Sequence, residues 1–185
     1  MKVFVNIPQG NVLESFFPTN IKEKLERLYD VEWNETDKNL TEDELMRAIK
    51  DVDVCFTSWG SIAFSSKVIE SANALKVIAH TGGTVASLTG DEVYDKGIRV
   101  ISGNDLYARS VAEGTICYIL AALRRLPQYC GVMASQGWHP SDWYSEGLLG
   151  QKVGLIGFGA VARHTLKLLQ AFDTEIYTAY SSAVL

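Results

Sequence analysis

Short apolar runs alternate with longer amphipathic stretches along about the first 105 residues of the chain. The short runs are rich in β-branched and aromatic residues, which favours strands, whereas the longer stretches carry apolar residues at helical spacing. The predicted strands are residues 3–7, 31–33, 53–57, 75–79 and 98–101. Strands that alternate with helices are typical of a parallel sheet. We therefore predict an α/β fold here, a flavodoxin-like parallel sheet of five β-α units.

Local signals mark where several of the intervening helices begin and end. Thr41 and Glu44 have the spacing of a capping box, and so do Asn20 and Glu23. Each pair therefore predicts a helix that starts just after its first residue. Gly97 ends a helical pattern and predicts a C-terminal cap, because glycine adopts the left-handed conformation without strain.

The second half of the chain has a different pattern. Apolar residues recur at intervals of three and four from residue 109 to about residue 135, which predicts one long helix. An irregular, aromatic-rich stretch follows. Residues 152–156, 163–172 and 175–178 then read as strand, helix and strand, the first β-α-β unit of a Rossmann domain.

The turn of that unit carries the form G-x-G-x-x-A, where a dinucleotide fingerprint needs it. Gly157 permits the tight turn, Gly159 lets a pyrophosphate approach the backbone, and Ala162 allows close packing of helix on strand. The free N–H groups of Ala160 and Val161 would then face the phosphates at the positive end of the helix dipole. The alternative is a glycine-rich turn that binds nothing.

The acid that would bind the ribose hydroxyls of NAD is absent. Its position about 20 residues further on is Tyr180, and residues 176–185 contain no Asp, Glu, Arg or Lys. We predict NAD as the cofactor with Tyr180 at the ribose position, and NADP stays open.

Four stretches make the sequence resemble the D-isomer-specific 2-hydroxyacid dehydrogenases. They are residues 75–88 with their glycine loop, 96–100, 109–113 with Ser-Val-Ala-Glu, and 150–159 with Gly-Leu-Ile-Gly-Phe-Gly. The resemblance implies a flavodoxin-like catalytic domain over residues 1–105, a long interdomain and dimerisation helix with its linker over 106–149, and an incomplete NAD-binding domain over 150–185.

The same resemblance implies that the loop of Gly82, Gly83 and Thr84 binds a substrate carboxylate through the amides of its last two residues. Consecutive amides in a glycine loop after a strand do form an anion-binding concavity, although a plain strand-to-helix turn has the same sequence pattern. The implied substrate is a small 2-oxo or 2-hydroxy acid, with NAD as the hydride carrier.

No residue of this sequence matches the family's catalytic arginine, acid and histidine, so we expect a truncated and inactive form. His80 follows the fourth strand, but no acid at a suitable spacing orients it as a base, and we interpret it as a loop or surface histidine. His139 falls in the linker and His164 on the exposed start of a helix. Glu113 reads as a solvated acid of a helix's first turn. None is assigned to catalysis.

Composition narrows the classes of partner. The chain has 185 residues, 47% hydrophobic and 21% charged, and a net charge of −5, which argues against a nucleic-acid surface. The longest uninterrupted apolar run is residues 116–123, so we predict no membrane span. The cysteines Cys55, Cys117 and Cys130 read as reduced, buried thiols of a cytoplasmic protein.

The long helix also predicts self-association. Its apolar stripe includes Val111, Ile119 and Leu123, and the resemblance implies that such helices form a dimer interface, so we expect a homodimer. A second hypothesis is a non-catalytic binding or assembly module that reuses the dehydrogenase fold. A flavin carrier fits less well, because residues 8–11 after the first strand lack a Ser/Thr-rich phosphate loop.

Overall fold

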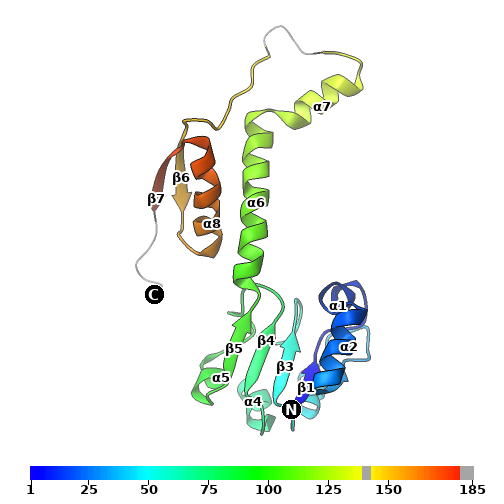
Figure 1. Cartoon of the computed structure of the whole chain (residues 1–185). Coiled ribbons are helices and arrows are strands. Elements are labelled where there is room, and N and C mark those ends of the chain that lie inside the picture. The colour runs from blue at the N-terminus through cyan, green and yellow to red at the C-terminus, as the bar shows by residue number, and fades with distance from the viewer. Residues whose placement is uncertain (139–142, 180–185) are drawn as a thin grey trace. The chain divides into compact units, whose positions relative to one another are not determined.

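The computed structural model describes residues 1–138 and 143–179 (Figure 1). It divides into two compact parts, unit 1 over Met1–Asn104 and unit 2 over Asp105–Leu185. The three-part domain division predicted from the sequence stays a prediction.

Unit 1 contains one parallel sheet with the strand order β2-β1-β3-β4-β5. Its strands are β1 (Lys2–Val5), β2 (Asp30–Trp33), β3 (Val54–Thr57), β4 (Val77–His80) and β5 (Arg99–Ser102). This is the flavodoxin-like order, in which the chain reverses direction across the sheet between β1 and β3. The predicted α/β fold with a parallel sheet is confirmed.

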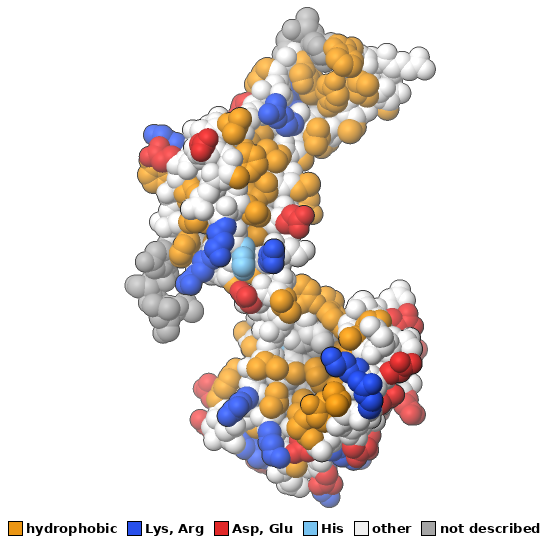
Figure 2. Space-filling model, in the orientation of Figure 1, with side chains coloured by type: hydrophobic (Ala, Val, Ile, Leu, Met, Phe, Trp, Pro, Cys, Tyr) orange, Lys and Arg blue, Asp and Glu red, His pale blue; other side chains and the backbone are white. Residues whose placement is uncertain are grey.

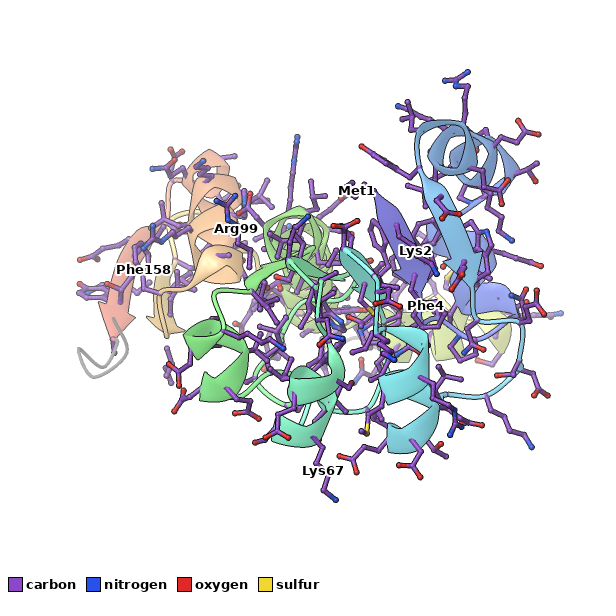
Figure 3. All side chains as sticks on the ribbon, turned by 90° about the horizontal axis from the view of Figure 1, so that it is seen from below. Met1, Lys2, Phe4, Lys67, Arg99 and Phe158 are labelled. Atoms are coloured by element: carbon purple, nitrogen blue, oxygen red, sulfur yellow. The ribbon has the colours of Figure 1, made fainter. Side chains whose placement is uncertain are left out.

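Helices cover both faces of this sheet. They are α1 (Asn11–Phe16), α2 (Thr19–Leu28), α3 (Glu42–Ala48), α4 (Ser66–Ser71) and α5 (Asp91–Asp95). Successive residues of β1 point to opposite faces: Val3 and Val5 join the core with α1, whereas Phe4 joins the core with α3 and α4. Figure 3 shows Phe4 directed inward and Lys67 on α4 directed away from the sheet.

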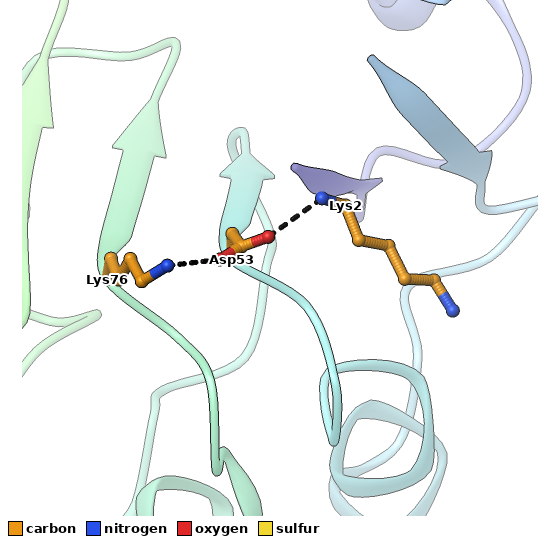
Figure 4. A network of polar contacts seen from close by, with 3 residues as sticks. All are labelled: Lys2, Asp53 and Lys76. Atoms are coloured by element: carbon orange, nitrogen blue, oxygen red, sulfur yellow. Dashed lines mark hydrogen bonds and ion pairs between the residues drawn. The ribbon is translucent and has the colours of Figure 1, made fainter.

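A carboxylate ties three strands together at the amino end of the sheet. The Asp53 carboxylate accepts a hydrogen bond from the backbone N–H of Lys2 at 2.8 Å. It also forms an ion pair with Lys76 Nζ at 2.6 Å (Figure 4). These hydrogen bonds hold the pKa of the Asp53 carboxyl below its usual value, the Lys76 contact contributing most.

One of the two predicted capping boxes is present. The Glu44 carboxylate accepts from the N–H and the hydroxyl of Thr41, at 2.8 and 2.7 Å, ahead of α3. The prediction at Asn20 and Glu23 is wrong, because α2 begins earlier, with Pro18 as its N-cap. Gly97 caps α5 as predicted, with φ +76°.

Unit 2 begins with two helices where the sequence predicted one. They are α6 (Asn104–Leu123) and α7 (Leu126–Ala134). Arg125 between them has φ 54°, a left-handed conformation, and Pro127 lies in the first turn of α7. Proline lacks the N–H that a continuous helix would use and its ring clashes with the preceding turn, so the helix ends before it.

The rest of unit 2 is the predicted β-α-β unit. It consists of β6 (Lys152–Ile156), α8 (Ala160–Leu169), the 3₁₀ helix η1 (Gln170–Phe172) and β7 (Glu175–Ala179), with β6 parallel to β7. Leu148 and Leu169 are the most deeply buried side chains of its core. The other face of the two strands is exposed: Ile156 is 98% and Tyr177 53% accessible.

Helix α6 contributes to this core. Ile116 is buried there, and Ile119 and Leu123 pack against it, so these last two do not belong to an exposed stripe as predicted. Val111 does, with 51% of its surface accessible.

Helix α6 is also the one helix in the described part of the chain that is long and apolar enough to cross a membrane. It has 20 residues and a mean hydropathy of 1.2, with 11% of that window buried. Core helices of soluble proteins reach the same length and composition, and α6 packs against the core of unit 2. The prediction of no membrane span rested on uninterrupted runs and stays a prediction.

The cysteine prediction is partly wrong. All three thiols are free, and Cys55 is buried in the sheet core, where burial raises the pKa of its thiol. Cys117 and Cys130 are exposed, because they lie on the solvent sides of α6 and α7.

Candidate functional site

The loop after β4 is held firmly at the carboxyl end of the sheet. Thr81 N–H donates to the Thr57 carbonyl of β3 at 2.8 Å. Gly103, just after β5, donates its N–H to the carbonyls of His80 and Gly82, at 3.1 and 3.0 Å. The loop is thereby fixed to both neighbouring strands, and the carbonyl oxygens of His80 and Gly82 are already paired.

Its amides, in contrast, are available. The N–H groups of Gly82, Gly83 and Thr84 donate to no acceptor among residues 1–138 and 143–179. Three successive free donors in one short loop form a concavity for an anion, such as a carboxylate. The structure thus brings together the three residues predicted to bind the substrate, and binding itself stays a prediction.

Unpaired polar atoms surround this end of the sheet. Asn6 Oδ1, Ser58 Oγ and Thr81 Oγ1 are buried and have no hydrogen-bond partner in the described part of the chain. They directly follow β1, β3 and β4, three adjacent strands. Buried polar groups are rarely left unpaired unless a ligand or water completes them. Asn6 and Ser58 are not among the residues predicted from the sequence, although each is a polar residue near the carboxyl end of a predicted strand.

The interpretation of His80 as a loop or surface histidine is wrong. His80 is the last residue of β4 and is only 8% exposed, and its Nδ1 lies 3.0 Å from the Thr57 hydroxyl. Burial holds the pKa of the imidazole below its usual value and so favours the neutral ring.

A cavity of about 280 Å³ lies beside the same edge. It is lined by the loop after β1, by Asn39 and by Trp59, whose ring stands 5.4 Å from that of Phe16. The crevice at the carboxyl ends of β1 and β3 is where open α/β sheets bind ligands.

The fingerprint turn in unit 2 folds as predicted between β6 and α8. Gly157 has φ +89° and donates its N–H to the Ala179 carbonyl at 2.7 Å. The first backbone bond of α8 runs from Arg163 to Gly159, which leaves the N–H groups of Ala160, Val161 and Ala162 without an acceptor in the described residues.

This turn is also open to a ligand. A Cβ added at Gly157 or Gly159 would meet no atom within 4 Å. Free amides at a helix N-terminus with an open approach fit a pyrophosphate. Tyr180, predicted at the ribose, lies outside the described residues, as does His139.

Residues 116–184 match the family described as D-isomer specific 2-hydroxyacid dehydrogenase, NAD binding domain. A D-3-phosphoglycerate dehydrogenase of Methanocaldococcus jannaschii is 34% identical over 137 residues, 74% of this chain and 26% of that protein. A hydroxypyruvate reductase of Thermotoga maritima is 31% identical over 148 residues, 80% of this chain and 48% of that protein. The chain belongs to the D-isomer-specific 2-hydroxyacid dehydrogenase family. It spans half the length or less of these relatives.

Solved structures share the fold of this family member. An acyclic imino acid reductase in complex with NADPH and D-Arg superimposes with a TM-score of 0.80 at 18% identity, over 100% of this chain and 58% of that one. The PH0520 protein from Pyrococcus horikoshii gives 0.75 at 24% identity, over 96% and 51%.

One cation near the family's fingerprint turn was missed in the sequence. Arg163 Nε donates to the Phe158 carbonyl at 3.3 Å, and its guanidinium lies 5.5 Å from the centre of the Phe158 ring. An arginine six residues after the first glycine of the turn is the signal that could have found it. Its charge favours an anion at this turn.

A second cavity, of about 560 Å³, lies within unit 2 and is lined by Arg109, Glu113, His164, Lys167 and Leu168. Figure 2 shows basic, acidic and histidine side chains gathered over α6 and α8.

Two predictions are corrected there. Glu113 lies in the middle of α6 rather than in its first turn. His164 is partly buried in α8, with Nε2 3.5 Å from an Asp105 carboxylate oxygen. No cluster of three or more metal-ligating side chains occurs in the described residues.

Proposed function

We propose that the protein is an NAD-dependent oxidoreductase that interconverts 2-oxo acids and D-2-hydroxy acids. The observation that carries this proposal is the loop of Gly82, Gly83 and Thr84, with three free amides beside three unpaired buried polar atoms. Relatives named D-3-phosphoglycerate dehydrogenase, hydroxypyruvate reductase and glyoxylate reductase support the same class of substrate.

The loop would fix the substrate through its carboxylate. Because the loop is fixed to β3 and to Gly103, the anion would meet donors that are already oriented, and little ordering cost would remain. The adjacent carbonyl carbon would then have a defined position for reduction. When bound, NADH supplies the hydride for that carbon.

The fingerprint turn would hold the cofactor's pyrophosphate. The free N–H groups of Ala160, Val161 and Ala162 and the cation of Arg163 support this role. We propose NAD as the cofactor. The choice between NAD and NADP stays open, since residues 176–185 contain no acid for the ribose hydroxyls and no cation for the additional phosphate of NADP.

We propose that these 185 residues alone do not turn over substrate. The buried His80 is hydrogen-bonded to a threonine rather than to an acid, and His164 faces Asp105 in unit 2. Incubation with NADH and glyoxylate, pyruvate or hydroxypyruvate should give no oxidation above a buffer control.

We further propose a cytoplasmic homodimer that binds neither nucleic acid nor membrane. The net charge of −5 supports the lack of nucleic-acid binding. Val111 and Tyr118 support self-association, because they lie seven residues apart on one side of α6 with 51% and 76% of their surfaces accessible. Light scattering should report a dimer, and a monomer at high concentration would contradict it.

The same exposed side chains favour a second candidate, a non-catalytic assembly module. It and the oxidoreductase differ in one property, which is whether the loop after β4 binds a small carboxylate.

Oxamate, a stable analogue of a 2-oxo acid, tests this difference. Titration of the ¹⁵N-labelled chain should shift the amide signals of Gly82, Gly83 and Thr84 together. Thr84→Pro removes one donor and should weaken binding about tenfold or more, whereas Thr84→Ala keeps the N–H and should bind within about threefold of the parent. If oxamate leaves these signals unmoved, the assembly module is favoured.

A further inference from the structure

The buried histidine beside the carboxylate loop has a partner on the next strand. His80 ends β4 and Thr57 ends β3, and the two residues face each other in the register of the sheet. The imidazole Nδ1 lies 3.0 Å from the Thr57 hydroxyl oxygen, and Thr57 is fully buried. The pair therefore bridges two strands where the loop begins.

The other ring nitrogen points at the loop. A Cβ added at Gly82 would lie 2.6 Å from His80 Nε2 and 2.9 Å from Trp59 Nε1, so two ring nitrogens converge on one side of this glycine. Within the described residues, Nε2 makes no hydrogen bond. An unpaired ring nitrogen on a side chain only 8% exposed, beside a row of free amides, is suited to a ligand.

The tautomer of a neutral imidazole determines whether Nε2 is a hydrogen-bond donor or acceptor for that ligand. One ring nitrogen carries a proton and the other accepts. A threonine hydroxyl can donate to Nδ1, and the ring proton then resides on Nε2. In that tautomer Nε2–H is a donor directed toward the anion concavity, and it adds no net charge.

We propose that His80 is a substrate-binding residue that donates Nε2–H to the bound carboxylate, with Thr57 holding it in that tautomer. This inference rests on the proposed function, because it concerns the same carboxylate loop. It assigns the histidine to binding rather than to acid–base catalysis, since the same donor serves substrate and transition state alike.

Histidine NMR on the whole 185-residue chain tests the proposal directly. In ¹H–¹⁵N spectra of the imidazoles, His80 should appear as the Nε2–H tautomer, assigned by its loss in His80→Leu. Oxamate should shift its Nε2 signal in the same titration that shifts the loop amides. Thr57→Val removes the hydroxyl donor and should mix the two tautomers.

The oxamate affinities of His80 variants distinguish a hydrogen-bond donor to the ligand from a ring that only fills space. His80→Leu should weaken oxamate binding about tenfold or more. His80→Gln places an amide donor near the Nε2 position and should recover binding to within about threefold. His164→Gln, a substitution in unit 2, should bind as the parent does. Amide spectra outside the loop report whether each variant is folded.

Two results would overturn the proposal, and only the second would also overturn the proposed carboxylate-binding loop. If the loop amides shift but the His80 signal does not, and a folded His80→Leu binds normally, His80 is no ligand while the carboxylate loop stands. If neither the amides nor His80 respond to oxamate, the loop assigned under the proposed function is lost as well.

Discussion

At the scale of single residues, position 82 requires a glycine for a reason that its backbone angles do not show. Its φ is not positive, so conformational freedom does not explain a glycine there. The reason is space, because the rings of His80 and Trp59 occupy the volume of a side chain. Gly83 differs, since the nearest atom to a Cβ there is Asn104 Oδ1 at 3.4 Å.

This contrast predicts different costs for the same substitution. Gly82→Ala should lower the free energy of unfolding by about 1–3 kcal/mol, because overpacking must displace a hydrogen-bonded ring. Gly83→Ala should cost less than about 1 kcal/mol, as an ordinary contact does. Urea denaturation followed by circular dichroism measures both. Equal costs would show that the two rings give way freely.

The sequence predicted the loop correctly but not the histidine beside it. A strand followed by His-Thr-Gly-Gly-Thr is a local pattern, and the turn follows from it. The burial of His80 depends on Thr57, 23 residues away on the neighbouring strand, and no spacing in the sequence encodes that contact. The missed groups Asn6 and Ser58 have the same origin, since strand order brings them together.

At the scale of elements, two sequence patterns with the same capping-box spacing fold differently. Thr41 and Glu44 are hydrogen-bonded as a box, whereas Pro18 begins α2 before Asn20 can act as its cap. Proline is well suited to the start of a helix, because its fixed φ fits and its missing N–H is not needed there.

Matched alanine variants measure this difference. Thr41→Ala should lower the free energy of unfolding by about 1 kcal/mol, through the loss of the cap of α3. Asn20→Ala, on the exposed side of α2, should change it by less than about 0.5 kcal/mol. Chemical denaturation with a constant m-value is the measurement. A comparable loss at Asn20 would mean that α2 starts about two residues later in solution, with Asn20 as its N-cap.

The link between β1, β3 and β4 predicts an acid sensitivity. The pKa of Asp53 is lowered in the folded chain by Lys76 and by the N–H of Lys2, so the unfolded state binds its proton first as the pH falls. The stabilisation is present above the ordinary aspartate pKa of about 3.9 and is lost as the pH falls through the lower folded value.

Asp53→Asn should therefore be less stable than the parent at pH 7, and the two should converge in acid. Urea midpoints between pH 7 and pH 2 give the comparison. Lys76→Met should reproduce part of the effect, because it removes the largest cause of the lowered pKa. A parent and an Asp53→Asn variant that lose stability in parallel down to pH 2 would rule out this contribution.

At the scale of the whole chain, unit 2 contains one β-α-β unit with a two-stranded parallel sheet. Two parallel strands pack one face on α6 and α8, and the other face leaves Ile156 and Tyr177 in solvent. Parallel sheets normally bury both faces. The fingerprint turn between β6 and α8 keeps its shape through local backbone geometry. A sheet of two strands, however, offers little surface that could contact the adenine or the ribose of a nucleotide.

NAD should consequently bind to this chain weakly, with a dissociation constant in the millimolar range, or about −4 kcal/mol. The contacts expected are those of the pyrophosphate with the free amides of Ala160, Val161 and Ala162. Gly159→Val tests them cleanly. An added Cβ there meets no atom within 4 Å, so the fold should survive while the valine side chain blocks the approach to the amides. Calorimetric titration should show that binding disappears.

Gly154→Val is the matched control for that substitution. Gly154 lies on the exposed face of β6 and also has no atom within 4 Å of an added Cβ, but it is not part of the turn. Its variant should bind NAD as weakly as the parent. Micromolar binding that Gly159→Val abolishes would mean that a second copy of the chain completes the nucleotide site. Binding that survives Gly159→Val would place the cofactor away from the fingerprint turn.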